Sequence, residues 1–184
     1  MISHHKELAG GEPTLEEYFF RPLLPQLRRL PAGKPGWLLL IDFKSDDARL
    51  VAEVYRLLRR HRKLLTTAGE DLRYGPLTVL LTGDNAAIAA FARRHPPGER
   101  YLAIGNREPL GREYRENVAE YFPEAATGFY RVFNFEWKHV EKLYRRGEPL
   151  SGAERERLQA LARAAHEKGY WLRTWTLNGS HFGG

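Results

Sequence analysis

The sequence predicts an α/β protein with a parallel sheet, because strand-length apolar runs alternate along the chain with segments of helical periodicity. Residues 38–41 are apolar without a break, as expected for a parallel strand that is buried on both faces. Apolar residues then recur at helical spacing over residues 46–61, with Ser45 or Asp46 as the expected cap. The same strand-then-helix order returns farther along the chain, which favours strands joined by helical crossovers.

Two capping boxes mark the beginnings of further helices. Thr14 and Glu17 open a helix that we expect to continue to residue 30, and Ser151 and Glu154 open one that Gly169 ends after residue 168. A short Ala-rich helix is predicted over residues 86–94, and residues 136–146 are expected to be partly helical. Further strands are predicted over residues 77–82, 100–104, 129–135 and 170–177. Residues 63–67 fit a short strand or a loop, and residues 105–115 are predicted to form an irregular loop.

Size and composition indicate one globular domain over residues 1–184. The net charge of +6 comes largely from arginine clusters near the ends of predicted helices, with no interleaved aromatic residues. This pattern is typical of a solvated face, so we expect no nucleic-acid partner. The chain has no cysteine, which excludes disulfides and thiol nucleophiles, and no apolar run of about 18 residues that would predict a transmembrane segment. Its first residues lack signal-peptide features, so the compartment stays unknown: cytoplasmic, or secreted if the true N-terminus lies upstream.

The strand ends favour a barrel over an open nucleotide-binding sheet. No glycine-rich phosphate loop follows any predicted strand, whereas scattered polar residues do. We therefore expect a TIM-type (β/α)8 barrel, although about six candidate strands in 184 residues fall short of eight βα units. The barrel is predicted to be incomplete, with its first and last units missing.

Several of these polar residues have the chemistry of an active site. Asp42 and Lys44 are two residues apart at the end of a strand, so their side chains are expected on the same side. His4 and His5 precede the first helix. Histidines, a carboxylate and a lysine suggest proton transfer beside a hard cation with oxygen ligands. The other polar residues expected near strand ends are Thr82, Asn85, Asn106, Arg107, Asn134, Trp137, Arg173, Trp175, Thr176 and Asn178.

Three stretches, in their order and spacing, carry a resemblance to a known family. They are residues 2–7 followed by 14–18, Ile41-Asp42-Phe43-Lys44, and Trp175-Thr176-Leu177-Asn178. The chain resembles the phospholipase C-like phosphodiesterase superfamily, which includes the glycerophosphodiester phosphodiesterases. Its closest similarity is to the phosphatidylinositol-specific phospholipase C-like group, whose members read LLIDIKT where this chain has residues 39–45.

The resemblance implies a barrel that binds one Mg²⁺ or Ca²⁺ ion and cleaves phosphodiesters with an acid/base histidine pair. It implies Asp42 as a metal ligand, Lys44 as the lysine that neutralises the phosphate, and His4 as the general acid. His5 stands where the family has Asp, so either histidine could be the counterpart. The candidate catalytic residues are thus His4, His5 and Lys44, and the candidate substrate-binding residues are Lys44, Trp137, Arg173, Trp175 and Asn178.

The family also has a histidine and a Glu-x-Asp pair in strands upstream of the position of His4. Activity is therefore expected only if the full barrel is assembled. The expected substrate is a glycerophosphodiester or a phospholipid-like phosphodiester. Two alternatives remain: a non-catalytic barrel remnant that binds a partner or self-associates through open sheet edges at the Ile2 and Thr174 strands, and a basic nucleic-acid-binding α/β domain.

Overall fold

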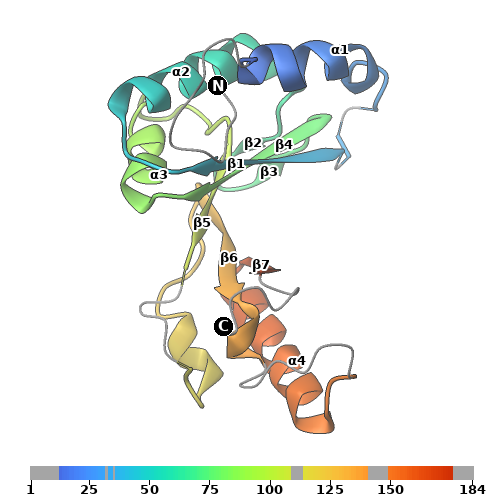
Figure 1. Ribbon diagram of the computed structural model, residues 1–184, viewed down its shortest axis with the longest axis vertical. Coiled ribbons are helices and arrows are strands. Elements are labelled where there is room, and N and C mark those ends of the chain that lie inside the picture. Colours follow the sequence, from blue (N-terminus) through green and yellow to red (C-terminus); the bar gives the residue numbers. More distant parts are fainter. Residues whose placement is uncertain (1–12, 32, 35, 109–113, 141–148, 176–184) are drawn as a thin grey trace. The chain divides into compact units, whose positions relative to one another are not determined.

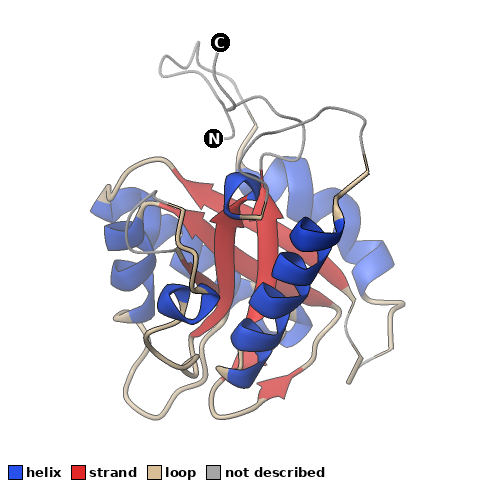
Figure 2. Cartoon of the chain, turned by 90° about the horizontal axis from the view of Figure 1, so that it is seen from below, coloured by secondary structure: helices blue, strands red, loops and turns tan. Residues whose placement is uncertain are grey.

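The computed structural model describes residues 13–31, 33–34, 36–108, 114–140 and 149–175. Its contacts divide the chain into two compact units, Met1–Ala103 and Ile104–Gly184, which we describe one at a time. Each unit contains parallel strands and α-helices in alternation (Figures 1 and 2), so the predicted α/β class is confirmed. A single domain over residues 1–184 stays a prediction.

The first unit is built on a parallel pair of strands. β1 (Trp37–Phe43) pairs with β4 (Leu77–Gly83) over seven residues, and Asp42 lies opposite Thr82. The connection between them carries α2 (Ala48–Arg60), as expected for a parallel crossover. The other elements of this unit are the π-helical turn η1 (Glu16–Phe20), α1 (Arg21–Leu27), η2 (Arg62–Leu64), the antiparallel pair β2 (Thr67–Ala68) and β3 (Leu72–Arg73), and α3 (Asn85–Ala92).

Helix starts in this unit follow local capping chemistry. The predicted capping box is confirmed, because the Glu17 carboxylate accepts from the Thr14 N–H (2.9 Å) and the Glu17 N–H donates to Thr14 Oγ1 (3.2 Å). The cap predicted for α2 at Ser45 or Asp46 is wrong. Asp47 caps this helix, because its carboxylate accepts from the N–H groups of residues 49 and 50 at 2.7 and 3.3 Å.

The prediction that β1 is buried on both faces is also wrong for the described residues. Leu39 and Phe43 are buried, whereas Leu38 is 54% exposed and Leu40 is 38% exposed. Exposure therefore alternates along β1 with the period of a strand that is covered on one face. β4 differs from β1, because its residues 77–82 are all buried. An unbroken apolar run predicts this burial on both faces for a parallel strand.

The second unit contains three parallel strands, β5 (Ile104–Arg107), β6 (Tyr130–Glu136) and β7 (Trp171–Trp175), paired in that order. Asn134 of β6 lies opposite Arg173 of β7. The helical elements of the unit are η3 (Val118–Tyr121), η4 (Trp137–His139) and α4 (Gly152–Glu167). The capping box of Ser151 and Glu154 opens α4, and Gly169 follows it with a φ of +78°, both as predicted.

The position predicted for the strand at residues 100–104 is wrong. β5 begins at Ile104 and continues through residues that the sequence suggests are a loop. Gly105 and Asn106 have low strand propensity, so local pattern alone favours a loop there. Tyr101 instead exchanges backbone hydrogen bonds with Ala68 at 2.8 and 2.9 Å.

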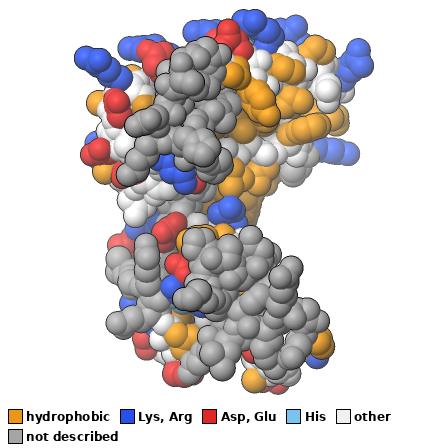
Figure 3. Space-filling model, viewed as in Figure 1, with side chains coloured by type: hydrophobic (Ala, Val, Ile, Leu, Met, Phe, Trp, Pro, Cys, Tyr) orange, Lys and Arg blue, Asp and Glu red, His pale blue; other side chains and the backbone are white. Residues whose placement is uncertain are grey.

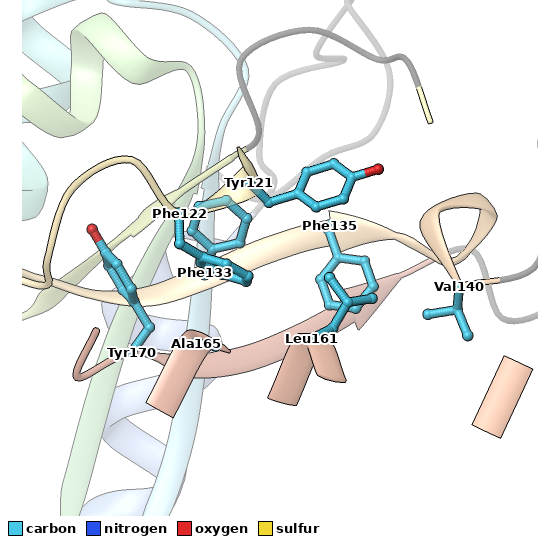
Figure 4. Packing of buried hydrophobic residues seen from close by; sticks show 8 residues of the cluster. All are labelled: Tyr121, Phe122, Phe133, Phe135, Val140, Leu161, Ala165 and Tyr170. Atoms are coloured by element: carbon cyan, nitrogen blue, oxygen red, sulfur yellow. The ribbon is translucent and has the colours of Figure 1, made fainter. Parts of the chain in front are cut away.

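An aromatic core joins β6 to α4 (Figure 4). Phe133 of β6 packs against Phe122 with ring centroids 4.4 Å apart, and against Tyr170 at 5.6 Å. Leu161 and Ala165 of α4 belong to the same buried cluster. The remaining members of the cluster are Tyr121, Phe135 and Val140.

His139 is buried at the edge of this core. Its Nδ1 atom lies 3.1 Å from the Tyr121 hydroxyl oxygen, which also accepts a hydrogen bond from the Arg115 N–H at 2.7 Å. With that oxygen already accepting from the backbone, the Tyr121 O–H is available to donate to a neutral His139 ring. Burial, and then the charge of Lys138, lowers the pKa of His139 to about 4.

Arg157 of α4 fixes the backbone around this histidine. Its guanidinium donates to the backbone carbonyls of His139 (2.5 Å), Glu116 (3.1 Å) and Arg115. It also stacks over the ring of Tyr114, 3.9 Å from the centroid. A protonated His139 would therefore lie close to a permanent positive charge.

We expect the second unit to lose stability as the pH falls. The pKa of His139 is lower in the folded chain than in the unfolded one, so its contribution is complete above about pH 6.5 and is lost as the pH falls toward 4. The loss should reach about 3 kcal/mol in the free energy of unfolding. Urea unfolding at several pH values would measure it. His139→Gln should flatten the dependence of the unfolding free energy on pH between about 6.5 and 4. The control His166→Gln, at an exposed position, should leave this dependence unchanged. Equal slopes in both variants would show that His139 does not cause the pH dependence.

Candidate functional site

Asp42 and Lys44 form an ion pair at the carboxyl end of β1. The Lys44 Nζ atom donates to Asp42 Oδ2 at 2.6 Å, so the prediction that the two side chains share one side is confirmed. The side chains are 46% and 66% exposed, respectively, so a ligand in solution can reach both charges. Exposed pairs of this kind contribute little stability, which leaves the pair free to open for a ligand.

Gly83 sets the position of Asp42. It ends β4 opposite Phe43 and has a φ of +90°. A Cβ atom at Gly83 would lie 2.2 Å from Asp42 Oδ1 and 2.2 Å from the Phe43 carbonyl oxygen. Only glycine allows both the conformation and the close approach, so Gly83 leaves room for the carboxylate at this place.

The described residues around Asp42 do not by themselves form a divalent-cation site. Asp42 Oδ2 is engaged by Lys44, and Oδ1 packs against Gly83. Within the described ranges, no group of three or more histidine and carboxylate side chains is arranged to hold a metal ion. Mg²⁺ can bind through one or two carboxylates and retain water ligands, so Asp42 could be one ligand but does not form a cage by itself.

The second unit carries a polar cluster on its three strands and at the residue that follows β5. We call it the amide–carboxylate cluster, and its members are Asn106, Asn134, Arg173 and the exposed Glu108. Glu108 Oε1 accepts from the side-chain amides of Asn106 (3.4 Å) and Asn134 (3.1 Å). The Arg173 guanidinium donates to Asn134 Oδ1 at 2.8 Å. Both asparagines are buried, at 1% and 4% exposure, so the cluster is built into the sheet.

A second polar row continues toward the strand ends. Glu136 lies two residues after Asn134, opposite Trp175 in register, and its carboxylate accepts from Lys138 at 2.5 Å. Because residues two apart on a strand share a face, Glu136 and Trp175 lie on the same face as Asn134 and Arg173. The opposite face, with Phe133 and Phe135, belongs to the aromatic core.

The structure describes three of the remaining predicted site residues, and the other three lie outside the described ranges. Arg173 joins the amide–carboxylate cluster, and Trp175 lies one register row beyond it. Trp137 packs against the aromatic core, so its side chain serves packing in the second unit. His4, His5 and Asn178 lie outside the described residues.

Sequence reasoning missed Glu108 because residues 105–115 were predicted to be an irregular loop. The polar residues at 106 and 108, two apart, were the available signal, since the same spacing recurs at 134 and 136.

Comparisons with known proteins yield no relative: no protein-family model, curated protein or solved structure matches the chain. In the part of the chain that the structure describes, no helix has the length and apolar character needed to cross a membrane. The function is therefore argued from the geometry of the two units.

We expect Gly83→Ala to disturb Asp42 directly, with Gly98→Ala as the matched control. Both glycines have positive φ, +90° and +83°, but a Cβ at Gly98 would meet nothing within 4 Å. The control should cost about 1 kcal/mol of folding free energy from backbone strain alone. Gly83→Ala should cost clearly more and should shift the NMR signals of Asp42. Equal losses of folding free energy in the two variants would contradict the close approach of Gly83 to the Asp42 carboxylate.

Proposed function

We propose that this chain is a phosphoric diester hydrolase of the phospholipase C-like type, active when its barrel is complete. The observation that carries the proposal is the Asp42–Lys44 pair at the carboxyl end of β1, with Nζ and Oδ2 2.6 Å apart. Active sites of parallel α/β folds lie at this end of the strands. An incomplete TIM-type barrel is part of the same proposal, supported by the parallel strands and helical crossovers of each unit.

The charges of these residues suit a phosphodiester. A phosphodiester is a monoanion that gains negative charge on its oxygens in the transition state, so cationic groups accelerate its cleavage. Lys44 is exposed enough to exchange its contact with Asp42 for a phosphate oxygen.

Each residue has a distinct role in this proposal. Asp42 orients Lys44 in the free protein and supplies a carboxylate ligand for Mg²⁺ or Ca²⁺. A cation bound there supplies Lewis-acid stabilisation of a phosphate oxygen. His4 and His5 are the proposed proton-transfer residues, on the strength of the family resemblance. The expected substrate remains a glycerophosphodiester or a phospholipid-like molecule.

The proposal predicts that Mg²⁺ or Ca²⁺ stabilises the wild-type chain and does not stabilise the Asp42→Asn variant. For the wild-type chain, millimolar Mg²⁺ or Ca²⁺ should raise the melting temperature, because a ligand that binds only the folded state stabilises it. Asp42→Asn should abolish this shift, because it removes the carboxylate charge that the cation would contact.

Asp46→Asn is the matched control, because Asp46 is an exposed carboxylate four residues away that does not cap α2. Asp46→Asn should keep the metal-induced shift. A metal-induced shift that survives in Asp42→Asn would contradict the role of this carboxylate. Absence of any metal-induced shift in the wild-type chain would contradict the proposal itself.

Self-association is a second candidate function, and the exposed face of β1 favours it. Trp37, Leu38 and Leu40 are all more than a third exposed, and Figure 3 shows apolar side chains gathered on one face of the first unit. Among the described residues of that unit, β1 is paired along one edge, with β4. An open edge beside exposed apolar residues favours pairing with a second chain.

Sedimentation velocity over a range of concentrations would test this second function. The wild-type chain should form dimers as its concentration rises, and Leu40→Lys should shift the population to monomer by placing a charge on the exposed face of β1. Tyr18→Lys is the control, since Tyr18 is 66% exposed on η1. A wild-type chain that stays monomeric throughout would rule this function out.

A further inference from the structure

The open edge of β1 carries the backbone groups of its even-numbered residues. The Trp37 N–H donates to the Pro76 carbonyl at 2.8 Å, and the Phe43 carbonyl accepts from the Asp84 N–H at 2.8 Å. Along a strand, the N–H and C=O groups of successive residues point to the two edges in alternation. The odd-numbered residues therefore bond toward β4, and the even-numbered ones point away from it. Among the described residues of the first unit, no strand pairs with that second edge.

The even-numbered residues also carry the exposed apolar side chains of this strand. Leu38 and Leu40 are exposed, whereas Leu39 between them is buried. Backbone groups at a sheet edge are satisfied by another strand, and exposed apolar side chains are satisfied by an apolar surface. An added strand provides both at once, so the chemistry of this edge selects an extended chain as its partner.

A second copy of β1 has the composition that this edge requires. Residues 37–41 are all apolar, so two such segments can oppose apolar side chains along their whole length. When two copies extend one sheet around a twofold axis, with their exposed faces on the same side, the paired strands run antiparallel. Antiparallel pairing is also the more stable of the two arrangements for each residue paired.

The backbone limits which residues can lie opposite one another. Because the outward groups belong to even-numbered residues, an even-numbered residue must face an even-numbered one. An alignment centred on residue 40 or 41 places the charged Asp42 opposite a leucine, and one centred on residue 38 places Leu40 opposite Gly36, before β1 begins. Only the alignment centred on residue 39 places Leu38 opposite Leu40 in both directions, which favours it over the others.

We propose that two copies of the chain pair through antiparallel β1 strands, with Leu38 of each copy opposite Leu40 of the other. This inference rests on self-association, the second function proposed above, and adds the strand, its direction and its register. The two leucines exchange backbone hydrogen bonds with the second copy, and their side chains form one apolar patch on the exposed face. Asp42 and Lys44 lie beyond the paired residues, so the dimer retains their ion pair.

Disulfide trapping tests the register, because the chain has no cysteine of its own. Leu38→Cys and Leu40→Cys, both at exposed positions of the full chain, are oxidised separately and as an equimolar mixture. The mixture should give several times more cross-linked dimer than either variant alone, because opposed side chains lie about 5 Å apart and diagonal ones about 7–8 Å. Tyr18→Cys, exposed on η1, is the control and should give no cross-link with either variant.

Paired charges provide a second measurement that needs no disulfide. Leu38→Lys and Leu40→Glu should each weaken dimerisation by about tenfold in sedimentation velocity, since each variant alone places a charge opposite leucine twice. Their mixture should recover dimers, because the two opposite charges face each other in the mixed dimer. A mixture of Leu38→Lys with Leu38→Glu is the matched control and should recover fewer dimers, because these positions are not opposed in the proposed register.

The outcomes separate the register from the function on which it rests. Trapping that is greatest within one cysteine variant, or recovery that is greatest for the two variants of Leu38, overturns the register and leaves self-association standing. Wild-type dimers that the cysteines do not trap and the charges do not weaken also overturn the inference, because the interface then lies elsewhere. A wild-type chain that stays monomeric contradicts self-association and this inference together.

Discussion

The alternation of side chains along β6 is the constraint on which the second unit depends. Phe133 and Phe135 enter the aromatic core with α4, so Asn134 and Glu136 must lie on the other face of the strand. The fixed register with β7 then brings Arg173 beside Asn134. A slip of one residue would place polar side chains in the core, so core packing and the polar cluster are two results of one register.

In the first unit, the position of the Asp42 carboxylate depends on the absence of a side chain at Gly83. The parallel pairing of β1 with β4 places Gly83 opposite Phe43, where a side chain would collide with the Asp42 carboxylate. Asp42 and Lys44 can therefore meet at the strand end while remaining accessible. In the first unit this pair lies at the carboxyl end of β1, the end of the strands at which parallel α/β folds present ligand-binding residues.

Elements with strong local signals were predicted well from the sequence, and elements that depend on distant partners were not. Both capping boxes, the glycine after α4 and the Asp42–Lys44 contact follow from residues four or fewer apart. β5 was misplaced because Gly105 and Asn106 have low strand propensity, and only pairing with β6 makes them a strand. The Glu108 contacts were missed for the same reason, since its partner Asn134 is 26 positions away.

By itself, the sequence determined the α/β class, the helix starts at Thr14 and Ser151, and the carboxylate–amine pair that ends β1, because periodicity and capping act over a few residues. Tertiary structure decided which face of β1 is buried, which residue caps α2, and that Asn106, Glu108, Asn134 and Arg173 form one cluster. These features depend on strand register and burial, which arise only when segments far apart in the chain pack together.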